Sequence, residues 1–318
     1  MRQMYGGMSM QPLQDSEKKL LREITGMEDP LKDGAYNLRL NGKAYARHSS
    51  KNIEIRPKTD KPGIDIVIAP GTKHEEVHIP VILSEAGMQD MVYNDFFVGE
   101  DSDVVIIAGC GIHNCSCEDN AHDGIHTFHV GRNARVRYVE KHYGEAESTG
   151  KNRMNPTTVI ELCEGAYMEM DTAQIRGVDH TVRTTRARLD RNAVLKITER
   201  IMTDGSQYAE THFDVDLDGE GSGTHVISRS VARGDSRQRF ISHVNGNHEC
   251  SGHTECDAII MDRACVSAVP EIVANSPDAR LIHEAAIGKI AGEQLMKLMT
   301  LGLTEKEAEE KIINGFIQ

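Results

Sequence analysis

The stretch DRNAVLKITE, residues 190–199, carries the pattern that decides the fold: a polar turn, an alanine, then residues of which every second one is apolar. The same pattern recurs in GRNARVRYVE at 131–140, CEGAYMEMDT at 163–172, DRACVSAVPE at 262–271 and SPDARLIHEA at 276–285. Alternation of this kind indicates β-strands, because successive side chains of a strand point to opposite faces. A small alanine after each turn suits a crowded corner where successive layers stack.

The spacing of the turns indicates a solenoid. Further turns at DGSQ (204–207), DGEGSG (218–223) and RGDS (233–236) lie between the third and fourth repeats in the chain. One turn follows another after roughly 14 residues, so two turns make a coil of roughly 28. Strands joined by tight turns, without helices between them, predict a β-helix. A β-sandwich, whose strands recur at a similar spacing, is the alternative.

Helical segments are predicted at both ends of this core. Residues 16–28 form a short helix in this prediction, with Ser16 as its cap and an apolar side made of Leu20, Leu21 and Ile24. Residues 29–60 are polar and loop-rich. The segment KIAGEQLMKLMTLG at 289–302 predicts a helix, and a capping box of Thr304 and Glu307 starts another.

The predicted fold is therefore an all-β core between two helical segments. Residues 1–60 form an N-terminal helical and loop segment, residues 61–287 a parallel β-helix, and residues 288–318 a two-helix tail. The scarcity of aromatic residues, 4% with no Trp, agrees with many thin, repetitive layers.

Composition argues against several classes of function. The net charge is −13 and no basic patch stands out, so we expect no nucleic-acid partner. No apolar run is long enough to span a membrane, and the N-terminus lacks the apolar segment of a signal peptide, so we expect a cytoplasmic protein. The absence of Trp disfavours a β-helix enzyme that stacks sugars on aromatic rings, and no phosphate-binding loop, GxSxG or HExxH motif is present.

The densest group of soft metal ligands lies in GCGIHNCSCEDNAHDGIHTFH, residues 109–129. Cys110, His113, Cys115 and Cys117 are the candidates, because thiolates and imidazoles this close together suggest zinc or an iron–sulfur cluster. Packed thiols and exposed imidazoles are the plainer interpretation. A zinc-dependent enzyme that uses residues 110–129 is the alternative function that this segment suggests.

A second candidate site combines Cys256 and Glu284. They are 28 residues apart, about one coil, and residues one coil apart stack on adjacent strands. An even separation also keeps them on the same face if no bulge intervenes, whereas His283 is expected to face the other way. The alternative is an ordinary buried cysteine beside a surface glutamate.

The C-terminal part of the chain resembles a known family. ECDAIIMDRACVSAVPEI at 255–272 and NSPDARLIHEAAIGKIAGEQLMKLMTLGLTEKEAEEKIINGF at 275–316 are similar to the C-terminal part of the SufB/SufD family of iron–sulfur cluster assembly proteins. The matching features are the Cys256–Asp257 pair, the HEA at 283–285 and the INGF at 313–316. The resemblance is strong over about 220–318 and looser back to about 60.

This resemblance implies a right-handed parallel β-helix and a scaffold, not an enzyme, that carries a transient iron–sulfur cluster. Cys256 and Glu284 match positions implicated as ligands in SufB-type chains, and His283 beside them is a further candidate. A homodimer through the C-terminal coils, a SufC-type ABC ATPase docked on residues 288–318, and a cysteine desulfurase as sulfur donor are the implied partners. A SufD-type subunit, which needs a different chain to carry the cluster, is the alternative within the family.

Overall fold

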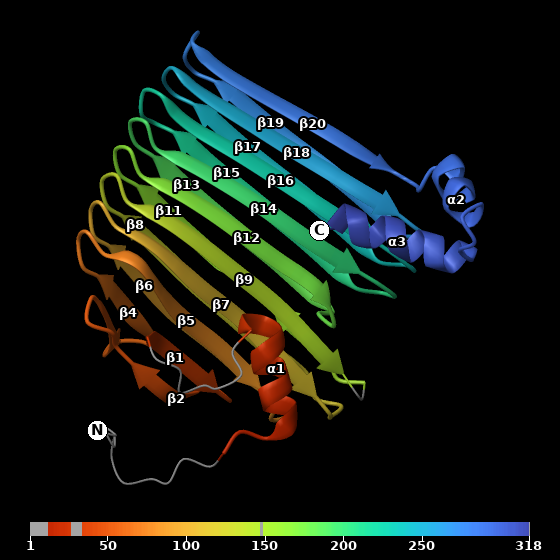
Figure 1. Ribbon diagram of the computed structural model, residues 1–318, viewed down its shortest axis with the longest axis horizontal. Helices are drawn as coiled ribbons and strands as arrows, with labels where there is room; N and C mark the ends of the chain where they lie inside the picture. Colours follow the sequence, from red (N-terminus) through yellow and green to blue (C-terminus); the bar gives the residue numbers. More distant parts are fainter. Residues whose placement is uncertain (1–11, 27–33, 147–148, 318) are drawn as a thin grey trace.

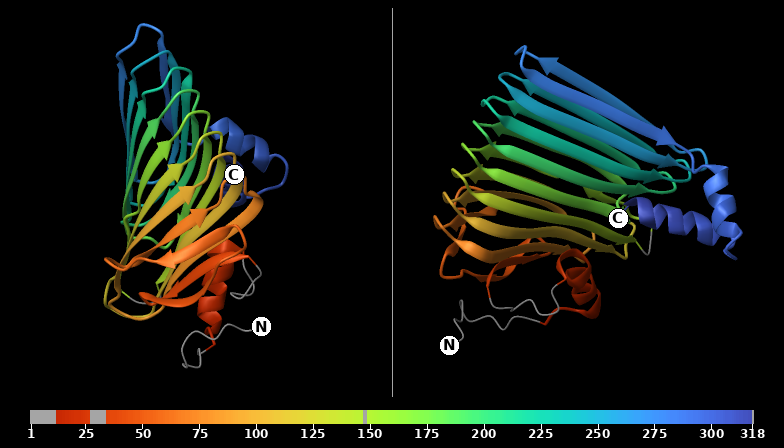
Figure 2. Two further views of the ribbon diagram at one scale, coloured as in Figure 1. Left: turned by 90° about the vertical axis from the view of Figure 1, so that its left-hand side faces the viewer. Right: turned by 45° about the horizontal axis from the view of Figure 1, so that its top comes forward.

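The computed structural model describes residues 12–26, 34–146 and 149–317 and shows a parallel β-helix with helices against it (Figure 1). From β4 onward the chain passes alternately through two sheets that face each other (Figure 2). Sheet A contains β1 (Ala35–Leu40), β2 (Lys43–His48), β5 (Lys73–Leu83), β7 (Asp103–Asn114), β9 (Arg135–Ala146), β12 (Tyr167–Arg176), β14 (Val194–Thr203), β16 (Ser222–Ala232), β18 (Cys250–Ile260) and β20 (Ala279–Gly288). Sheet B contains β3 (Ile53–Pro57), β4 (Gly63–Ile68), β6 (Gln89–Val98), β8 (Asn120–Val130), β10 (Asn152–Met154), β11 (Thr157–Leu162), β13 (His180–Leu189), β15 (Tyr208–Leu217), β17 (Arg237–Gly246) and β19 (Cys265–Ala274).

The pairing between coils is parallel, which confirms the β-helix and excludes the sandwich. Ser222 of β16 pairs with Cys250 of β18, one predicted period later in the chain. The coil length is not constant, however. The coil from Tyr167 to its partner Val194 is shorter than the predicted period, and the coil from Asp103 to its partner Arg135 is longer than it. The turns absorb these differences, so most strands keep a row of apolar residues on the inner face.

The alanines at the turns before strands of sheet A stack at one corner of the β-helix, as predicted, whereas Ala264 precedes β19 of sheet B and lies apart from them. Ala134, Ala166 and Ala193 are all buried there. The residue before each of them has a left-handed backbone, with φ of 56° at Asn133 and 68° at Gly165. Asn tolerates this conformation and Gly adopts it freely. A Cβ at Gly165 would also lie 2.5 Å from Oδ1 of Asn133, so the stack leaves no space for a side chain.

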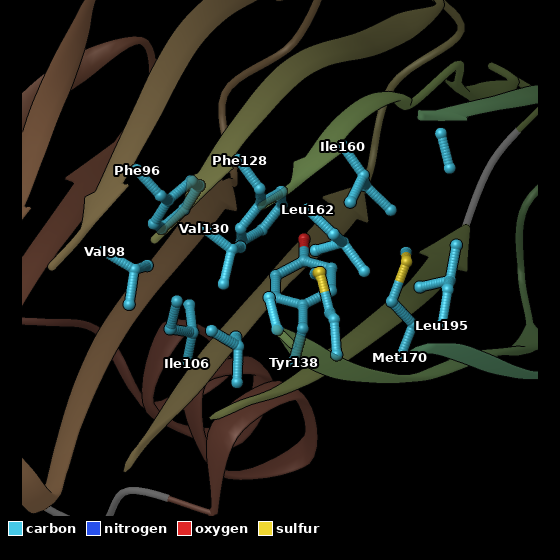
Figure 3. Close-up of a cluster of buried hydrophobic side chains, with 14 of the residues drawn as sticks. Phe96, Val98, Ile106, Phe128, Val130, Tyr138, Ile160, Leu162, Met170 and Leu195 are labelled. Carbon is cyan, nitrogen blue, oxygen red and sulfur yellow. The ribbon is translucent and has the colours of Figure 1, made fainter. Parts of the chain in front are cut away.

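Apolar side chains fill much of the space between the two sheets. Figure 3 shows part of this core, where Phe96, Phe128 and Tyr138 lie together. The rings of Phe96 and Phe128, one coil apart, stack with their centroids 4.3 Å apart. Such stacking of like residues on neighbouring coils is the packing mode of a solenoid.

The rest of the interior is polar and carries buried charge. Arg183 lies between Glu140, at 2.5 Å, and Glu199, at 3.5 Å, and all three side chains are almost fully buried. The hydroxyl of Tyr138 donates a 2.8 Å hydrogen bond to Glu140, and His126 Nδ1 lies 2.8 Å from that hydroxyl. Buried charges of this kind are tolerated only when they are paired and hydrogen-bonded.

The N-terminal segment differs in part from its prediction. Helix α1 (Asp15–Thr25) buries Leu20, Leu21 and Ile24 as expected, but its cap is Gln14, whose N–H donates to the Glu17 carboxylate, and not Ser16. Residues 27 and 28 of the predicted helix lie outside the described residues. The segment expected to be loop contains strands β1, β2 and β3. β1 is buried along most of its length and β2 is not buried, so neither shows alternation, and β3 alternates over only 5 residues.

The C-terminal tail contains helices α2 (Gly292–Met299) and α3 (Glu305–Ile317). The predicted capping box is confirmed, since the Thr304 N–H donates to Glu307 at 2.8 Å and the Glu307 N–H donates back to Thr304 Oγ1 at 3.3 Å. Helix α3 packs Ile313 against Val231 and Ile259, at the ends of β16 and β18. Among the described helices, none is long and apolar enough to cross a membrane.

Candidate functional site

Cys256 occupies the inner face of β18, in the last but one coil. Its partners on either side are Ser228 of β16 and Ala285 of β20. The side chain is buried, with only 2% of the residue exposed. Burial raises the pKa of the Cys256 thiol to about 12, and the nearby Glu199 and Asp257 carboxylates add to the shift.

A small polar cavity adjoins Cys256 inside the β-helix. Ser228 and Thr211 line it and donate hydrogen bonds of 3.0 and 3.1 Å to Glu199. Burial raises the pKa of Glu199, and Arg183 offsets only part of this effect. Glu199, Ser228 and Cys256 occupy one row on three successive strands of sheet A, so the thiol continues a column of polar side chains.

Glu284 does not share a face with Cys256, so that expectation is wrong. Glu284 pairs with Glu255, and Ala285, the next residue along the chain, lies opposite the thiol. The cause is a turn: residues 275–278 form a four-residue connection before β20, whereas residues 247–249 form a three-residue connection before β18. One extra residue displaces the register by one and moves Glu284 to the outer face, where 65% of its side chain is exposed.

The same displacement brings His283 to the inner face, on the side of Cys256 and not away from it. His283 pairs with Thr254, and its Nδ1 lies 2.7 Å from the Thr254 hydroxyl. Burial and the neighbouring His253 lower the pKa of His283, which favours the neutral imidazole. A neutral imidazole is the form that binds metals. Thr254, which orients the ring, was not identified from the sequence.

A pair of histidines on the outer face was also missed. His225 and His253 stack with ring centroids 4.9 Å apart, and His253 Nε2 lies 3.5 Å from the Glu284 carboxylate. The two histidines are one predicted period apart and pair directly across β16 and β18. A search for histidines at the coil period would have found them.

The four candidates of the Cys/His-rich segment are not brought into one site. Cys110 lies inside the β-helix, where burial raises the pKa of its thiol well above the usual value. His113 follows it by three residues on β7, an odd separation, and therefore faces outward. Cys115 and Cys117 are exposed in the turn after β7. Within residues 12–26, 34–146 and 149–317, no three Cys, His, Asp or Glu side chains are grouped to hold a metal ion, which gives no support to the zinc-enzyme alternative.

Inside the β-helix, Cys110 instead adjoins a second cavity lined by histidines. His126 and His142 are buried there beside Glu140, and burial lowers the pKa of His126 to about 4 and that of His142 to about 3. Burial opposes the charge of Glu140 as well, yet Arg183 and the two histidines together lower the pKa of this carboxyl. The neutral imidazoles of His126 and His142 therefore lie beside the buried ion pair of Glu140 and Arg183.

The end of the β-helix nearest Cys256 is open. Strand β20 is the last strand of sheet A and β19 the last of sheet B, so each pairs on one side within the described chain. Large apolar side chains are exposed on these two strands: Val269, Ile272, Ile282 and Ile287. Unpaired strand edges with apolar side chains are surfaces that favour association with another chain.

Comparison with known proteins identifies relatives along most of the chain. Residues 83–316 match the family model described as "SUF system FeS cluster assembly, SufBD core domain". An iron–sulfur cluster assembly SufBD family protein of Methanocaldococcus jannaschii is 27% identical over 83% of this chain and 84% of its own length. Others from Archaeoglobus fulgidus and Pyrococcus horikoshii are 29% and 28% identical, over 81% and 86% of this chain and 69% and 84% of their own lengths.

Proposed function

This chain belongs to the SufBD family of iron–sulfur cluster assembly proteins, and we propose that it is a scaffold, not an enzyme, on which a cluster is built, held briefly and passed on. The observation that carries the proposal is the joint placement of Cys256 and His283. Both face the interior of the last two coils of sheet A, next to the open end of the β-helix.

The donor atoms at this end suit a cluster that must be released. A cysteine thiolate is a strong ligand for cluster iron, and histidine replaces cysteine on one iron of some [2Fe–2S] centres. Glu284, on the outer face of the same coil, offers a harder oxygen ligand. A mixed set of this kind holds iron less tightly than four thiolates, which is what a scaffold needs.

Two copies of the chain would complete the site. The exposed apolar residues on β19 and β20 support a homodimer in which the C-terminal coils of the two protomers meet. One protomer supplies few ligands, and a two-fold interface would present each of them twice. Cys256 is buried one coil below the open end, so the last coil must move before the thiol can reach iron.

An ATPase of the SufC type is the proposed source of that motion. Helix α2 has no buried residues, and Met296, Met299 and Leu301 are exposed on it and just after it, which supports a docking surface. Helix α3 connects this surface to the β-helix through Ile313, which touches Val231 of β16 and Ile259 of β18. Strand β18 also carries Cys256, so a displacement of α3 would act on the strand of the thiol.

Anaerobic co-expression with a SufC-type ATPase and a cysteine desulfurase tests the proposed function. A cluster-bearing scaffold would show broad absorbance near ~400 nm, typical of thiolate-bound iron–sulfur clusters, and would pass the cluster to an apo-ferredoxin. A colourless protein that contains stoichiometric zinc would contradict the proposal.

A further inference from the structure

The structure assigns a reactive thiol to Cys115: we propose that Cys115, with His113 and Glu145, attacks the S–S bond of an incoming sulfur electrophile. This site lies at the turn after β7, and strands β9, β12, β14 and β16 separate it from β18, which carries Cys256. The inference goes beyond the proposed function, because thiol reactivity at this turn requires neither a cluster nor a dimer.

The thiol and its base are within contact distance. Sγ of Cys115 lies 3.0 Å from Nε2 of His113, and the Cys115 side chain is exposed. His113 is the outward-facing residue near the end of β7, so the turn folds the thiol back over the ring. A thiol beside an imidazole that can take its proton is the arrangement of an activated cysteine nucleophile.

A carboxylate lies on the side of the imidazole ring that faces away from the thiol. His113 and Glu145 are direct partners on β7 and β9, and Nδ1 of His113 lies 3.7 Å from the Glu145 carboxylate. This Nδ1 is shielded from solvent and has no hydrogen-bond partner within the described residues. A slight rotation of either side chain closes the contact, and such contacts are often loose before a substrate binds.

Glu145 is itself held in place by residues from two elements. Lys19 of α1 donates to its carboxylate at 2.6 Å, and the Tyr143 hydroxyl donates at 2.8 Å. The Lys19 hydrogen bond is the main reason why the pKa of Glu145 is lowered. Helix α1 can reach this point because it packs directly on β7 (Figure 1), where Gly111 leaves space for Leu20. The fold therefore fixes a nucleophile, a base and a group that orients the base.

The reaction is an exchange of one S–S bond for another. Cys115 gives its proton to Nε2 of His113, and its sulfur attacks one sulfur of the electrophile. The S–S bond of the electrophile breaks, its electron pair leaves on the second sulfur, and that sulfur takes the proton back from His113. With a persulfide, the outer sulfur moves to Cys115 and a thiol leaves; with a disulfide, a mixed disulfide forms. No external oxidant or reductant is needed for this step.

Cys117 is the internal control for reactivity. It lies two residues from Cys115 in the same turn and is also exposed. We expect iodoacetamide to alkylate Cys115 at least about tenfold faster than Cys117, as measured by peptide mass spectrometry. His113→Ala should reduce the rate at Cys115 to that at Cys117, whereas His129→Ala, on β8 of the other sheet, should leave it unchanged. Equal rates at the two cysteines, or no effect of His113→Ala, would overturn the proposal.

Two probes distinguish the sources of the S–S bond. Glutathione persulfide would add one sulfur atom to Cys115, and oxidised glutathione would add a glutathionyl group; whichever reacts faster identifies the class. If neither modifies Cys115 faster than Cys117, the proposal is wrong. The purified protein suffices, free of iron and ATPase, so a failure here is distinct from a failure of the scaffold function.

Glu145 acts as a positioning residue in this scheme, through His113. Glu145→Gln should slow the modification of Cys115 about fivefold and shift its rate profile to higher pH. The titratable groups that face the thiol and its base in this profile are His113 and Glu145. Tyr143 from β9, Lys19 from α1 and Arg176 from β12 lie behind them. A purely structural carboxylate would leave both the rate and the profile of Cys115 unchanged.

Discussion

Cys256 and Glu284 lie on opposite faces of two neighbouring strands, the thiol inside the β-helix and the carboxylate outside it. Ala285, not Glu284, is the residue that pairs with Cys256. A single cluster can therefore reach both side chains only at the edge of the last coil. His283, on the inner face, is the closer companion of the thiol in the fold.

Removal of the Cys256 thiol should abolish cluster retention. Cys256→Ala is expected to lose most of the absorbance near ~400 nm in the anaerobic co-expression, because this residue would supply the strongest ligand of the proposed scaffold. The matched control is Cys250→Ala, which removes another buried, inward-facing thiol from the same strand. Each change should cost only about 1 kcal/mol of stability. Equal spectra for the two variants would exclude Cys256 as a ligand.

The face that holds the cluster can be identified by a comparison of two adjacent residues. His283→Ala should lower the bound iron per protomer more than Glu284→Ala does, since His283 shares the inner face with Cys256. Glu255→Ala, which removes the outer-face partner of Glu284, is the control and should retain full iron. Iron content by colorimetric assay is the measurement. A larger loss for Glu284→Ala would place the cluster on the outer face.

Replacement of Arg183 should lower the free energy of unfolding strongly, because buried carboxylates surround this side chain. Arg183→Met leaves Glu140 and Glu199 without their shared cation and should lower the free energy of unfolding by about 3–5 kcal/mol. Arg186→Met, on the exposed face of the same strand, should change it by less than about 0.5 kcal/mol. Urea denaturation followed by circular dichroism gives both values. Similar values for the two variants would contradict a structural role for the buried chain of charges.

Stability should decrease as the pH falls from about 6.5 towards 4. His126 and His142 are neutral in the folded protein, with pKa values of about 4 and about 3. Below pH 6.5 the unfolded chain binds protons at both residues while the folded chain does not, so the stability they confer is present above 6.5 and lost below it. The double variant His126→Gln/His142→Gln should show a shallower slope of unfolding free energy against pH in this window. An unchanged slope would show that these histidines do not cause the effect.

Deletion of the C-terminal tail should abolish partner binding but not folding. Deletion of residues 289–318 is expected to leave the β-sheet circular dichroism signal and to abolish capture of the ATPase. It also exposes Val231 and Ile259, which Ile313 covers, so some loss of stability is expected. Met296→Glu with Leu301→Glu changes only exposed side chains and should abolish capture without that loss. Persistent ATPase binding by this double variant would show that the partner docks elsewhere.

The fold could be predicted because the pattern recurs in many coils. Most of the long strands alternate between buried and less buried residues, and the stacked alanines at Ala134, Ala166 and Ala193 mark the corner. The strands at 35–57 escaped prediction because β1 and β2 show no period of two and β3 alternates over only 5 residues.

The faces of the site residues could not be predicted, for a different reason. The predicted period places His225 opposite His253, yet Cys256 pairs with Ala285, one position beyond that period. The difference is one residue in the turn at 275–278, and turn residues carry no pattern that fixes their number. The resemblance to a family therefore pointed to Cys256, His283 and Glu284 as candidate ligands but did not indicate which of them face each other.

Because one end of the β-helix is open, the local stability of the coils differs along the molecule. Each inner coil is held by a neighbouring coil on both sides, but the coil of β19 and β20 has one neighbour within the described chain. In a stack of this kind the ends fray at a fraction of the free energy of global unfolding. Exposure of Cys256 therefore requires only the free energy needed to detach the last coil. The other coils stay folded while the C-terminal end of the β-helix opens and closes.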